Sequence, residues 1–319
     1  MLRSTEDLRI RELRPSRPQP PLDPFAPPRG LLERERRRGR LERSLTVFLT
    51  GAECPFTCVF CDLWRHTLDG PAPPGALPAQ LRQALAAAGA GPATVDRIKL
   101  YNASNWFDPR AVPRSEFDAL GRLVAPFGAV TVESHALMVG PRCQAFADRI
   151  GGRLEVAIGL ETVHPGALPR LNKAMTLEDF DRAAVWLGER EMDLRVFALV
   201  GAPFIPPEES VAWAVRTAEY ALDRGAAIVS LIPVRPGPGE QARLAAAGEF
   251  TAPSLVQLED ALDRCLRRGM DGVTADLWDA DRLAACPTCR PGRLGRLDAM
   301  NRTGVSAPAV ACLICRGGP

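Results

Sequence analysis

The sequence Cys54-Pro-Phe-Thr-Cys58-Val-Phe-Cys61 places three cysteines within eight residues, just past an apolar run near Leu45–Gly51. Thiolates are the usual ligands of iron–sulfur clusters, and a cubane cluster contains four irons. Three cysteines on one short loop can hold three corners of the cube, which leaves the fourth iron without a protein ligand. A small molecule with an amine and a carboxylate can coordinate there. The segment therefore predicts an open [4Fe-4S] site.

Outward from this loop, apolar β-branched runs alternate with helical patterns. Strands are predicted near 45–51, 97–103, 129–134, 154–161, 194–200 and 227–234, and helices near 77–88, 114–125, 141–150, 176–190, 207–224 and 253–268. Thr176 and Asp179 form a capping box that predicts the start of one helix. Six alternating units require a parallel sheet with right-handed crossovers. A flat doubly wound sheet and an incomplete (β/α) barrel both fit, and in either the chemistry belongs at the carboxyl ends of the strands.

The composition describes a globular chain of modest charge. Of its 319 residues, 46% are hydrophobic, and the net charge is +2, so a nucleic-acid surface has to be a local patch. The N-terminus, MLRSTEDLRIREL, is charged throughout, and no window approaches the roughly 20 apolar residues of a membrane span. We expect a soluble cytoplasmic protein with no signal peptide and no membrane partner.

The two ends of the chain differ in composition from its middle. Residues 1–44 form a Pro-rich and basic N-terminal extension, with prolines crowded in 15–28 and a basic run from 29 to 43. The basic run can form a short helix and serve either as a solvated arm or as an arm that contacts phosphates. Residues 45–269 are expected to form the α/β core, and residues 270–319 a small C-terminal metal module.

With Phe60 in the aromatic position before the last cysteine, the triplet resembles the signature of the radical S-adenosylmethionine (SAM) superfamily. Segments after the later strands resemble the branch containing the archaeosine tRNA synthase radical subunit and, more distantly, the elongator catalytic subunit. These segments are KLYNASNWFD (99–108), TVESHA (131–136), VAIGLET (156–162), LNKAMT (171–176) and FALVGAPF (197–204). The resemblance covers roughly residues 45–268 and implies a partial (β/α)6 TIM-like barrel.

The resemblance also implies cofactors and partners. A [4Fe-4S] cluster would bind SAM and cleave it reductively to a 5′-deoxyadenosyl radical, with electrons from a donor such as a flavodoxin or ferredoxin. Members of this branch generally act on tRNA, so tRNA is a candidate partner.

The same resemblance implies a set of cofactor-binding residues. The second-strand loop should lie along the methionine moiety of SAM, and acidic residues of the third and fourth strands should lie near the cofactor. The residues are Phe60, Asn102, Ser104, Asn105, Glu133, Glu161 and Arg195. Asn102 and Ser104 can equally just shape the turn, and Arg195 can be a solvated edge charge. Glu133 and Glu161 stand in apolar strands, where a buried charge is costly without a partner.

Four further cysteines form two C-x2-C knuckles, Cys286-Pro-Thr-Cys289 and Cys312-Leu-Ile-Cys315. Four thiolates in two knuckles predict a metal site, with zinc as the first choice and an auxiliary iron–sulfur cluster as the second. A redox or unmetallated module is the remaining alternative. The intervening arginines suit either phosphate contacts or a solubilising surface; they are Arg290, Arg293, Arg296 and Arg302.

The alternatives for the triplet are a structural zinc site, with His66 as a fourth ligand, or inert thiols.

For the whole chain we expect, from the triplet and the resemblance, a radical SAM enzyme that modifies tRNA or a nucleoside. A radical SAM enzyme acting on a small molecule or peptide is the second hypothesis. A non-catalytic metal-binding or electron-transfer protein is the third.

Overall fold

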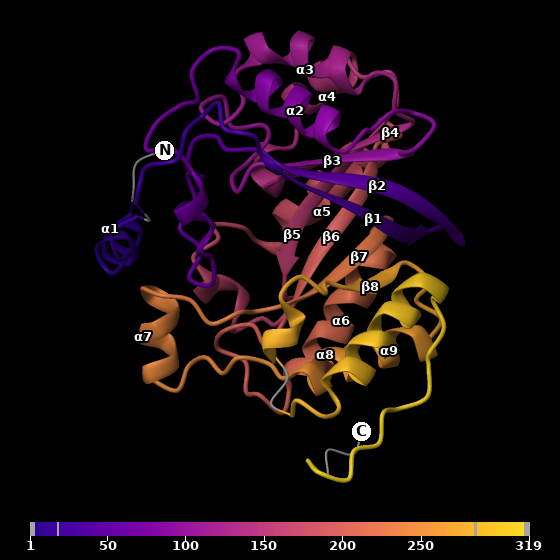
Figure 1. Ribbon diagram of the computed structural model, residues 1–319. Coiled ribbons are helices and arrows are strands. Elements are labelled where there is room, and N and C mark those ends of the chain that lie inside the picture. Colours follow the sequence, from indigo (N-terminus) through magenta and orange to yellow (C-terminus); the bar gives the residue numbers. More distant parts are fainter. Residues whose placement is uncertain (1–3, 18, 284–285, 316–319) are drawn as a thin grey trace.

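The computed structural model describes residues 4–17, 19–283 and 286–315, and the parts of the expected terminal segments outside these ranges are not described. The strands are β1 (Arg29–Arg37), β2 (Arg40–Phe48), β3 (Arg97–Tyr101), β4 (Ala129–Ser134), β5 (Arg153–Glu161), β6 (Asp193–Val200), β7 (Ala226–Pro233) and β8 (Val273–Ala275). The α-helices are α1 (Thr5–Glu12), α2 (Ala76–Ala87), α3 (Phe117–Val124), α4 (Pro141–Ala147), α5 (Leu177–Gly188), α6 (Ser210–Asp223), α7 (Glu240–Ala246), α8 (Leu255–Arg267) and α9 (Arg290–Thr303). Figure 1 shows their arrangement.

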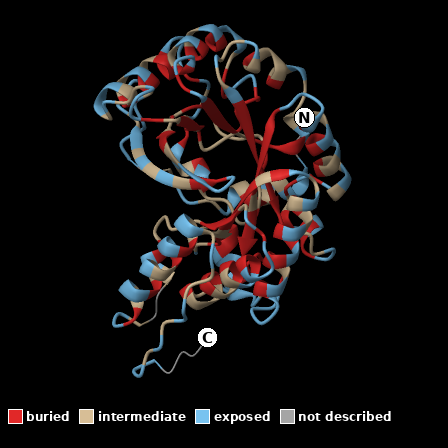
Figure 2. Ribbon diagram, turned by 90° about the vertical axis from the view of Figure 1, so that its right-hand side faces the viewer, coloured by how far each residue is buried: buried red, intermediate tan, exposed pale blue. Residues whose placement is uncertain are grey.

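One eight-stranded sheet runs through the described residues in the order β1 to β8. β1 pairs with β2 antiparallel, and every later pair is parallel. The connections between the parallel strands carry helices that cover the sheet, as right-handed βα units require. Buried residues concentrate on the strands and the inward faces of the helices (Figure 2). The predicted partial barrel is confirmed, and all six predicted strands are present.

The predicted capping box is also present. Thr176 caps α5, its side chain accepts a hydrogen bond from the Asp179 backbone N–H, and the Asp179 carboxylate accepts one from the Thr176 backbone. Such reciprocal caps satisfy backbone donors that the first helical turn leaves without partners.

The basic run near the N-terminus forms a strand rather than the short helix that its composition allowed. Residues 29–37 are β1, which pairs in register with β2 from Arg29 opposite Phe48 to Arg37 opposite Arg40. The sheet therefore begins well before the expected boundary at residue 44. Arg36 and Arg37 are buried, so this part of the run is neither a solvated arm nor free to contact phosphates.

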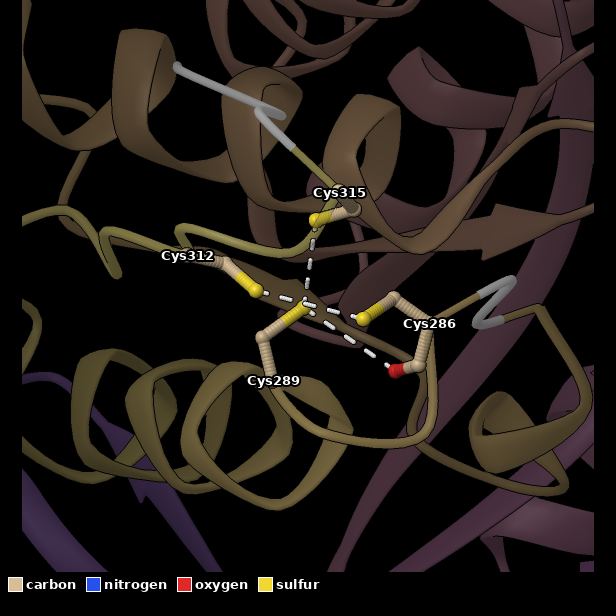
Figure 3. A group of neighbouring side chains, drawn as sticks. All are labelled: Cys286, Cys289, Cys312 and Cys315. Atoms are coloured by element: carbon tan, nitrogen blue, oxygen red, sulfur yellow. Dashed lines mark hydrogen bonds between the residues drawn. The ribbon is translucent and has the colours of Figure 1, made fainter.

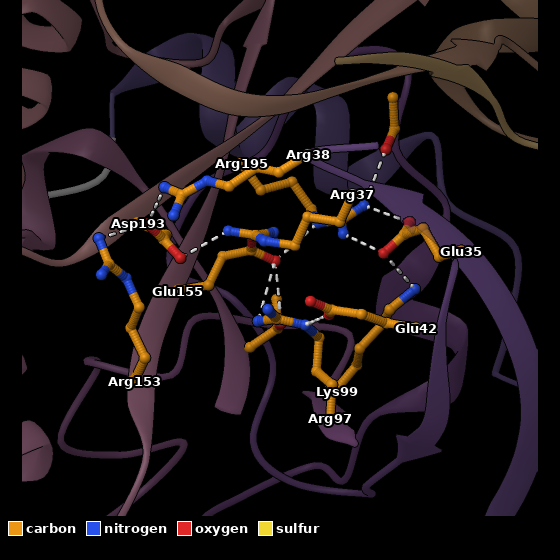
Figure 4. A network of polar contacts seen from close by, with 12 residues as sticks. Glu35, Arg37, Arg38, Glu42, Arg97, Lys99, Arg153, Glu155, Asp193 and Arg195 are labelled. Atoms are coloured by element: carbon orange, nitrogen blue, oxygen red, sulfur yellow. Dashed lines mark hydrogen bonds and ion pairs between the residues drawn. The ribbon is translucent and has the colours of Figure 1, made fainter. Parts of the chain in front are cut away.

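Ion pairs close the sheet on itself at the amino ends of its strands (Figure 4). Arg195 on β6 donates to Glu35 on β1 at 2.8 Å and to Glu155 on β5 at 2.9 Å. Arg37 on β1 pairs with Glu155 and with Asp193. Because β5 and β6 lie four and five strands away from β1 in the sheet, these pairs span the interior of the barrel.

The C-terminal segment closes the opposite side of the same sheet. β8 adds to β7, with Val229 opposite Val273. The amide side chain of Asn301 on α9 accepts from the N–H of Ala275 and donates to its carbonyl, both at 2.8 Å. Helix α9 also packs against β1, so it covers both edge strands. β8 and α9, both after residue 269, are thus packed onto the sheet of the barrel.

No helix among the described residues is long and apolar enough to cross a membrane.

Candidate metal and cofactor site

The three clustered cysteines lie on the loop between β2 and α2, at the carboxyl end of β2. The N–H of Cys61 donates to the carbonyl of Cys58, and the N–H of Val59 donates to the carbonyl of Leu171 at 3.0 Å. The loop is thereby attached to the segment that follows β5. All three cysteines are free thiols and partly exposed.

The thiols of this loop need a metal centre in order to ionise. Desolvation and the neighbouring Cys58 raise the pKa of Cys54 to about 12, and desolvation also raises the pKa values of Cys58 and Cys61. These sulfurs are therefore poor thiolates unless a positive metal centre stabilises them.

The donor set of the loop fits a cubane better than one zinc ion. Structural zinc sites use four protein ligands. This loop supplies three thiols, which can bind three irons of a [4Fe-4S] cluster and leave the fourth iron open.

The predicted second-strand loop lies beside the cysteine loop, after β3. Asn102 is fully buried; its side-chain oxygen accepts from the N–H of Ser104 at 3.3 Å, while its Nδ2 has no partner. The Ser104 hydroxyl is likewise buried without a partner. Buried polar atoms without partners are uncommon and call for a ligand or water. Ala103 has a φ of +53°, a conformation that favours glycine, so the loop forms a glycine-type turn without glycine.

Asn105 and Glu133 hold this loop in place. The Asn105 side-chain oxygen accepts from Ser134 Oγ at 2.9 Å and from the His135 N–H at 3.1 Å. Glu133 accepts the N–H of Asn102 at 2.7 Å. Burial raises the pKa of Glu133 to about 7, although the backbone donors of the loop oppose the shift. Asn105 and Glu133 thus fix the position of the loop after β3.

Glu161 ends β5 and forms a buried ion pair with Lys173. Their charged atoms lie 2.8 Å apart, and the two side chains are 7% and 9% exposed. Glu161 has a φ of +68° at a β-bulge, a strained conformation of the kind that clusters at functional sites. Burial lowers the pKa of Lys173, but Glu161 and the thiols of Cys58 and Cys54 outweigh it, so the pKa is raised and the ammonium keeps its charge.

Lys173 is a functional candidate that lies in the segment 171–176, to which the resemblance drew attention without giving this residue a role. The chain contains two lysines, Lys99 and Lys173, and both are buried inside the barrel, whereas its other basic residues are arginines. That contrast was readable from the sequence. Lys173 also fixes His135, because its carbonyl accepts from His135 Nε2 at 2.8 Å.

His135, directly after β4, and Phe56 connect this strand to the cysteine loop. Their rings stack with centroids 3.8 Å apart. Burial, and then the nearby Lys173, lower the pKa of His135 to about 3, so the ring is neutral. The His135 Nδ1 accepts from the N–H of Leu137 at 3.1 Å. The neutral ring is hydrogen-bonded through both of its nitrogens and stacks on Phe56, so His135 contributes to the packing of the site.

The two remaining residues predicted to bind the cofactor, Phe60 and Arg195, lie in different parts of the structure. Phe60 lies on the cysteine loop, and its carbonyl accepts from Gln241 at 2.6 Å. Arg195 lies apart, in the ionic network at the amino ends of the strands, where Glu35 and Glu155 neutralise it (Figure 4). The structure therefore brings Asn102, Ser104 and the cysteines together but not Arg195.

The C-terminal quartet forms a second, tighter group (Figure 3). The sulfurs of Cys286 and Cys312 lie 3.9 Å apart, and those of Cys289 and Cys315 lie 3.8 Å apart. All four sulfurs are within 4.8 Å of one another. These separations match the edge of a tetrahedron around one ion with bonds of about 2.3 Å.

The arginines between the two knuckles anchor α9. Arg293 is buried; it donates to Cys289 Sγ at 3.3 Å and pairs with Glu259 of α8 at 2.5 Å. Arg296 pairs with Asp263 at 2.7 Å, also on α8. Arg302 lies 3.8 Å from Asp298 on the same helix. The contacts of Arg293 and Arg296 with α8 hold the quartet against the barrel.

No protein-family model matches the sequence, and no curated protein matches it. Solved structures do match. The archaeal Elp3 of Methanocaldococcus infernus, with residues 1–46 deleted, aligns over 73% of this chain at 13% identity and a TM-score of 0.52. The alignment spans 59% of that Elp3 chain. A radical SAM methyltransferase from Sphaerobacter thermophilus aligns over 77% of this chain and 76% of its own at 19% identity and a TM-score of 0.50. At these identities the likeness is one of fold: the chain has the fold of the radical SAM enzymes.

Proposed function

We propose that this protein is a radical SAM enzyme. The observation that carries the proposal is the loop of three free thiols, Cys54, Cys58 and Cys61, beside the two partnerless buried atoms of Asn102 and Ser104. When bound, a reduced [4Fe-4S] cluster and SAM together supply a 5′-deoxyadenosyl radical. A flavodoxin or ferredoxin would be the electron donor, and a cytoplasmic location suits thiols that must stay reduced.

The residues of this chain would bind and orient the cofactor. Asn102 Nδ2 and the Ser104 hydroxyl would bind the polar methionine end of SAM, with Asn105 and Glu133 holding their loop. Lys173 carries a positive charge near Cys54 and Cys58, which offsets the negative charge of ligating thiolates. Glu161 fixes the position of that ammonium. Phe60 packs against the core beside the last ligand.

For the substrate, we favour a nucleoside or another planar ring. Partly exposed aromatic side chains meet inside the barrel near the carboxyl ends of the strands. The rings of Tyr101 and Phe197 lie 6.2 Å apart, and those of Phe48 and Trp278 lie 5.2 Å apart. Arg29 lies over the Trp278 ring at 4.1 Å. Aromatic faces and arginine planes are the groups on which nucleobases stack.

Whole tRNA is a weaker proposal than a nucleoside. The arginines expected to contact phosphates at the two ends of the chain largely serve the fold, as Arg37, Arg293 and Arg296 illustrate. Without them a phosphate-binding surface loses the charges that would make binding salt-dependent. A small aromatic molecule or peptide remains the second candidate, since the same rings would accept it.

We propose structural zinc for the C-terminal quartet. Its sulfur separations of 3.8 and 3.9 Å suit a single tetrahedral ion, and its four thiolates fill the coordination sphere. Arg293 would offset part of the negative charge of the site. The metal would fix the start of α9, which in turn covers both edges of the sheet.

The test is anaerobic turnover of SAM with a chemical reductant, measured as 5′-deoxyadenosine. The wild type and a Cys143→Ala variant, which alters a buried cysteine outside the site, should both form the nucleoside. A Cys58→Ala variant should form none. No product from iron-loaded wild type would refute the proposal and favour a non-catalytic metal-binding or electron-transfer protein.

A further inference from the structure

The N-terminal segment 4–17 lies along the cysteine loop, far from it in sequence but in contact with it in space. One point of contact is Asp7 on α1. Its Oδ1 accepts from the hydroxyl of Thr57, which stands directly before Cys58, and from Asn172 Nδ2 at 3.0 Å. Asn172 Nδ2 also donates to Thr57 Oγ1 at 2.8 Å. Asp7 thus joins α1, the cysteine loop and the segment that carries Lys173.

A second point of contact is Glu53, which directly precedes Cys54. Three arginines of the N-terminal segment converge on its carboxylate. Arg11 lies at 2.5 Å, Arg14 at 2.8 Å and Arg17 at 2.6 Å. A partly buried carboxylate with three cationic partners is held more firmly than one exposed pair would hold it.

A third point of contact follows Cys61. Arg17 donates to the carbonyl of Trp64 at 2.5 Å and to the carbonyl of Thr67 at 2.6 Å. The guanidinium of Arg14 lies 4.9 Å from the Trp64 ring centroid. The contacts therefore bracket the three cysteines: one lies before Cys54, one between Cys54 and Cys58, and one after Cys61.

The segment is held mainly by these polar contacts. Ile10 is its one residue in the buried core among the described residues 4–17, and Arg9 pairs with Glu240 at the start of α7 at 2.9 Å. The cysteine loop itself has little regular structure: its only helix, Leu63–His66, begins after the last cysteine. The loop thus depends on partners from elsewhere in the chain to hold its ligands in place.

We propose that segment 4–17 is a cover that positions the cysteine loop and shields the cluster from solvent and oxygen. The inference rests on the proposed cluster at Cys54, Cys58 and Cys61. Asp7 and Glu53 are its positioning residues. A pocket of about 170 Å³ between the segment and the loop is lined by Arg11, Glu53, Cys54 and Arg110. Cys54 lines this pocket, whereas Cys58 follows Thr57, whose hydroxyl is bonded to Asp7 of the cover.

The experiment compares Asp7→Ala with Ser4→Ala. Ser4 caps α1 and bonds to the Asp7 backbone, so Ser4→Ala weakens the helix without removing the Asp7 contacts to Thr57 and Asn172. Thr57→Val is a second variant that breaks the same contact from the side of the loop. Two rates are measured for each protein. One is iodoacetamide labelling of each cysteine in metal-free protein, resolved by mass spectrometry, and the other is the loss of cluster absorbance in air.

Asp7→Ala and Thr57→Val should label Cys58 roughly tenfold faster than wild type, as expected when a charge-assisted hydrogen bond is lost. Labelling of Cys54 should change less, and cluster loss in air should accelerate in parallel. Ser4→Ala should resemble wild type. Equal labelling of Cys58 in all four proteins would overturn the cover. A wild type that binds no iron would instead refute the proposed function, while the labelling rates would still decide whether the segment covers the loop.

Discussion

Replacing Glu155 by glutamine tests whether the ionic network closes the barrel. Glu155 is fully buried, accepts from Arg195 Nε and Thr131 Oγ1 at 2.9 Å each, and pairs with Arg37. Burial raises the pKa of Glu155, but Arg195, Arg97 and Arg37 outweigh it and hold the pKa well below its ordinary value, so the carboxylate is charged. Glutamine keeps the shape and removes the charge.

The expected loss follows from the partners left behind. Removing one member of a buried ion pair costs about 3–5 kcal/mol, because the other charge stays buried and uncompensated. Arg195 keeps Glu35 and Arg37 keeps Asp193, so we expect the lower end, about 3 kcal/mol. With a slope of about 3 kcal/mol per molar urea, the unfolding midpoint should fall by roughly 1 M.

Urea unfolding followed by tryptophan fluorescence measures the shift. The matched control is Glu189→Gln, which removes an exposed pair with Arg190 at 3.3 Å and should change stability by less than about 0.5 kcal/mol. If Glu155→Gln unfolds at the same urea concentration as the control, the network does not hold the barrel closed.

Three further outcomes are expected. Cys289→Ser should lose the zinc, keep the iron and melt at a lower temperature, as metal analysis and thermal unfolding will report. A variant that loses iron and keeps zinc would show that the C-terminal quartet holds the iron. Lys173→Met should make the cluster's reduction potential more negative, because a cation near the cluster favours the added electron; an unchanged potential in a redox titration would remove Lys173 from the site. Hydrogen bonds from Thr57, Ser4 and Asn172 outweigh the opposing effect of burial and lower the pKa of Asp7 to about 2 from 3.8. Its contribution to stability is therefore complete above about pH 4 and lost toward pH 2. The free energy of unfolding of Asp7→Ala should therefore decrease less steeply than that of wild type between pH 4 and pH 2. Equal slopes for the two proteins would contradict the Asp7 contacts.

The alternation of apolar runs and helical patterns was enough to predict six strands and their helices, because each parallel strand is buried on both faces. The first strand was missed for a physical reason. The inward residues of β1 are Glu33, Glu35 and Arg37, which meet Lys99, Arg195 and Glu155 in the barrel. A strand whose inner face is charged shows no hydrophobic period, so its sequence resembles a solvated arm.

The candidate site also has one part that could be predicted from the sequence and one part that could not. The cysteine ligands were predictable, since their spacing on one loop is local. The Lys173–Glu161 pair joins a strand end to the loop after it, and Asp7 meets Asn172 across 165 residues of chain. Contacts of this kind depend on the path of the backbone, which no local pattern encodes. Arg195 was named because of the resemblance, but one of its two carboxylate partners, Glu35, lies on β1, the strand that was missed.

Counting iron and zinc per chain in anaerobically prepared protein tests the central claim most directly. We predict about four irons and about one zinc in the wild type. A variant with Cys54, Cys58 and Cys61 all changed to alanine should lose the irons and keep the zinc. Zinc alone in carefully reconstituted wild type, or irons retained by the triple variant, would contradict a [4Fe-4S] cluster on the cysteine loop.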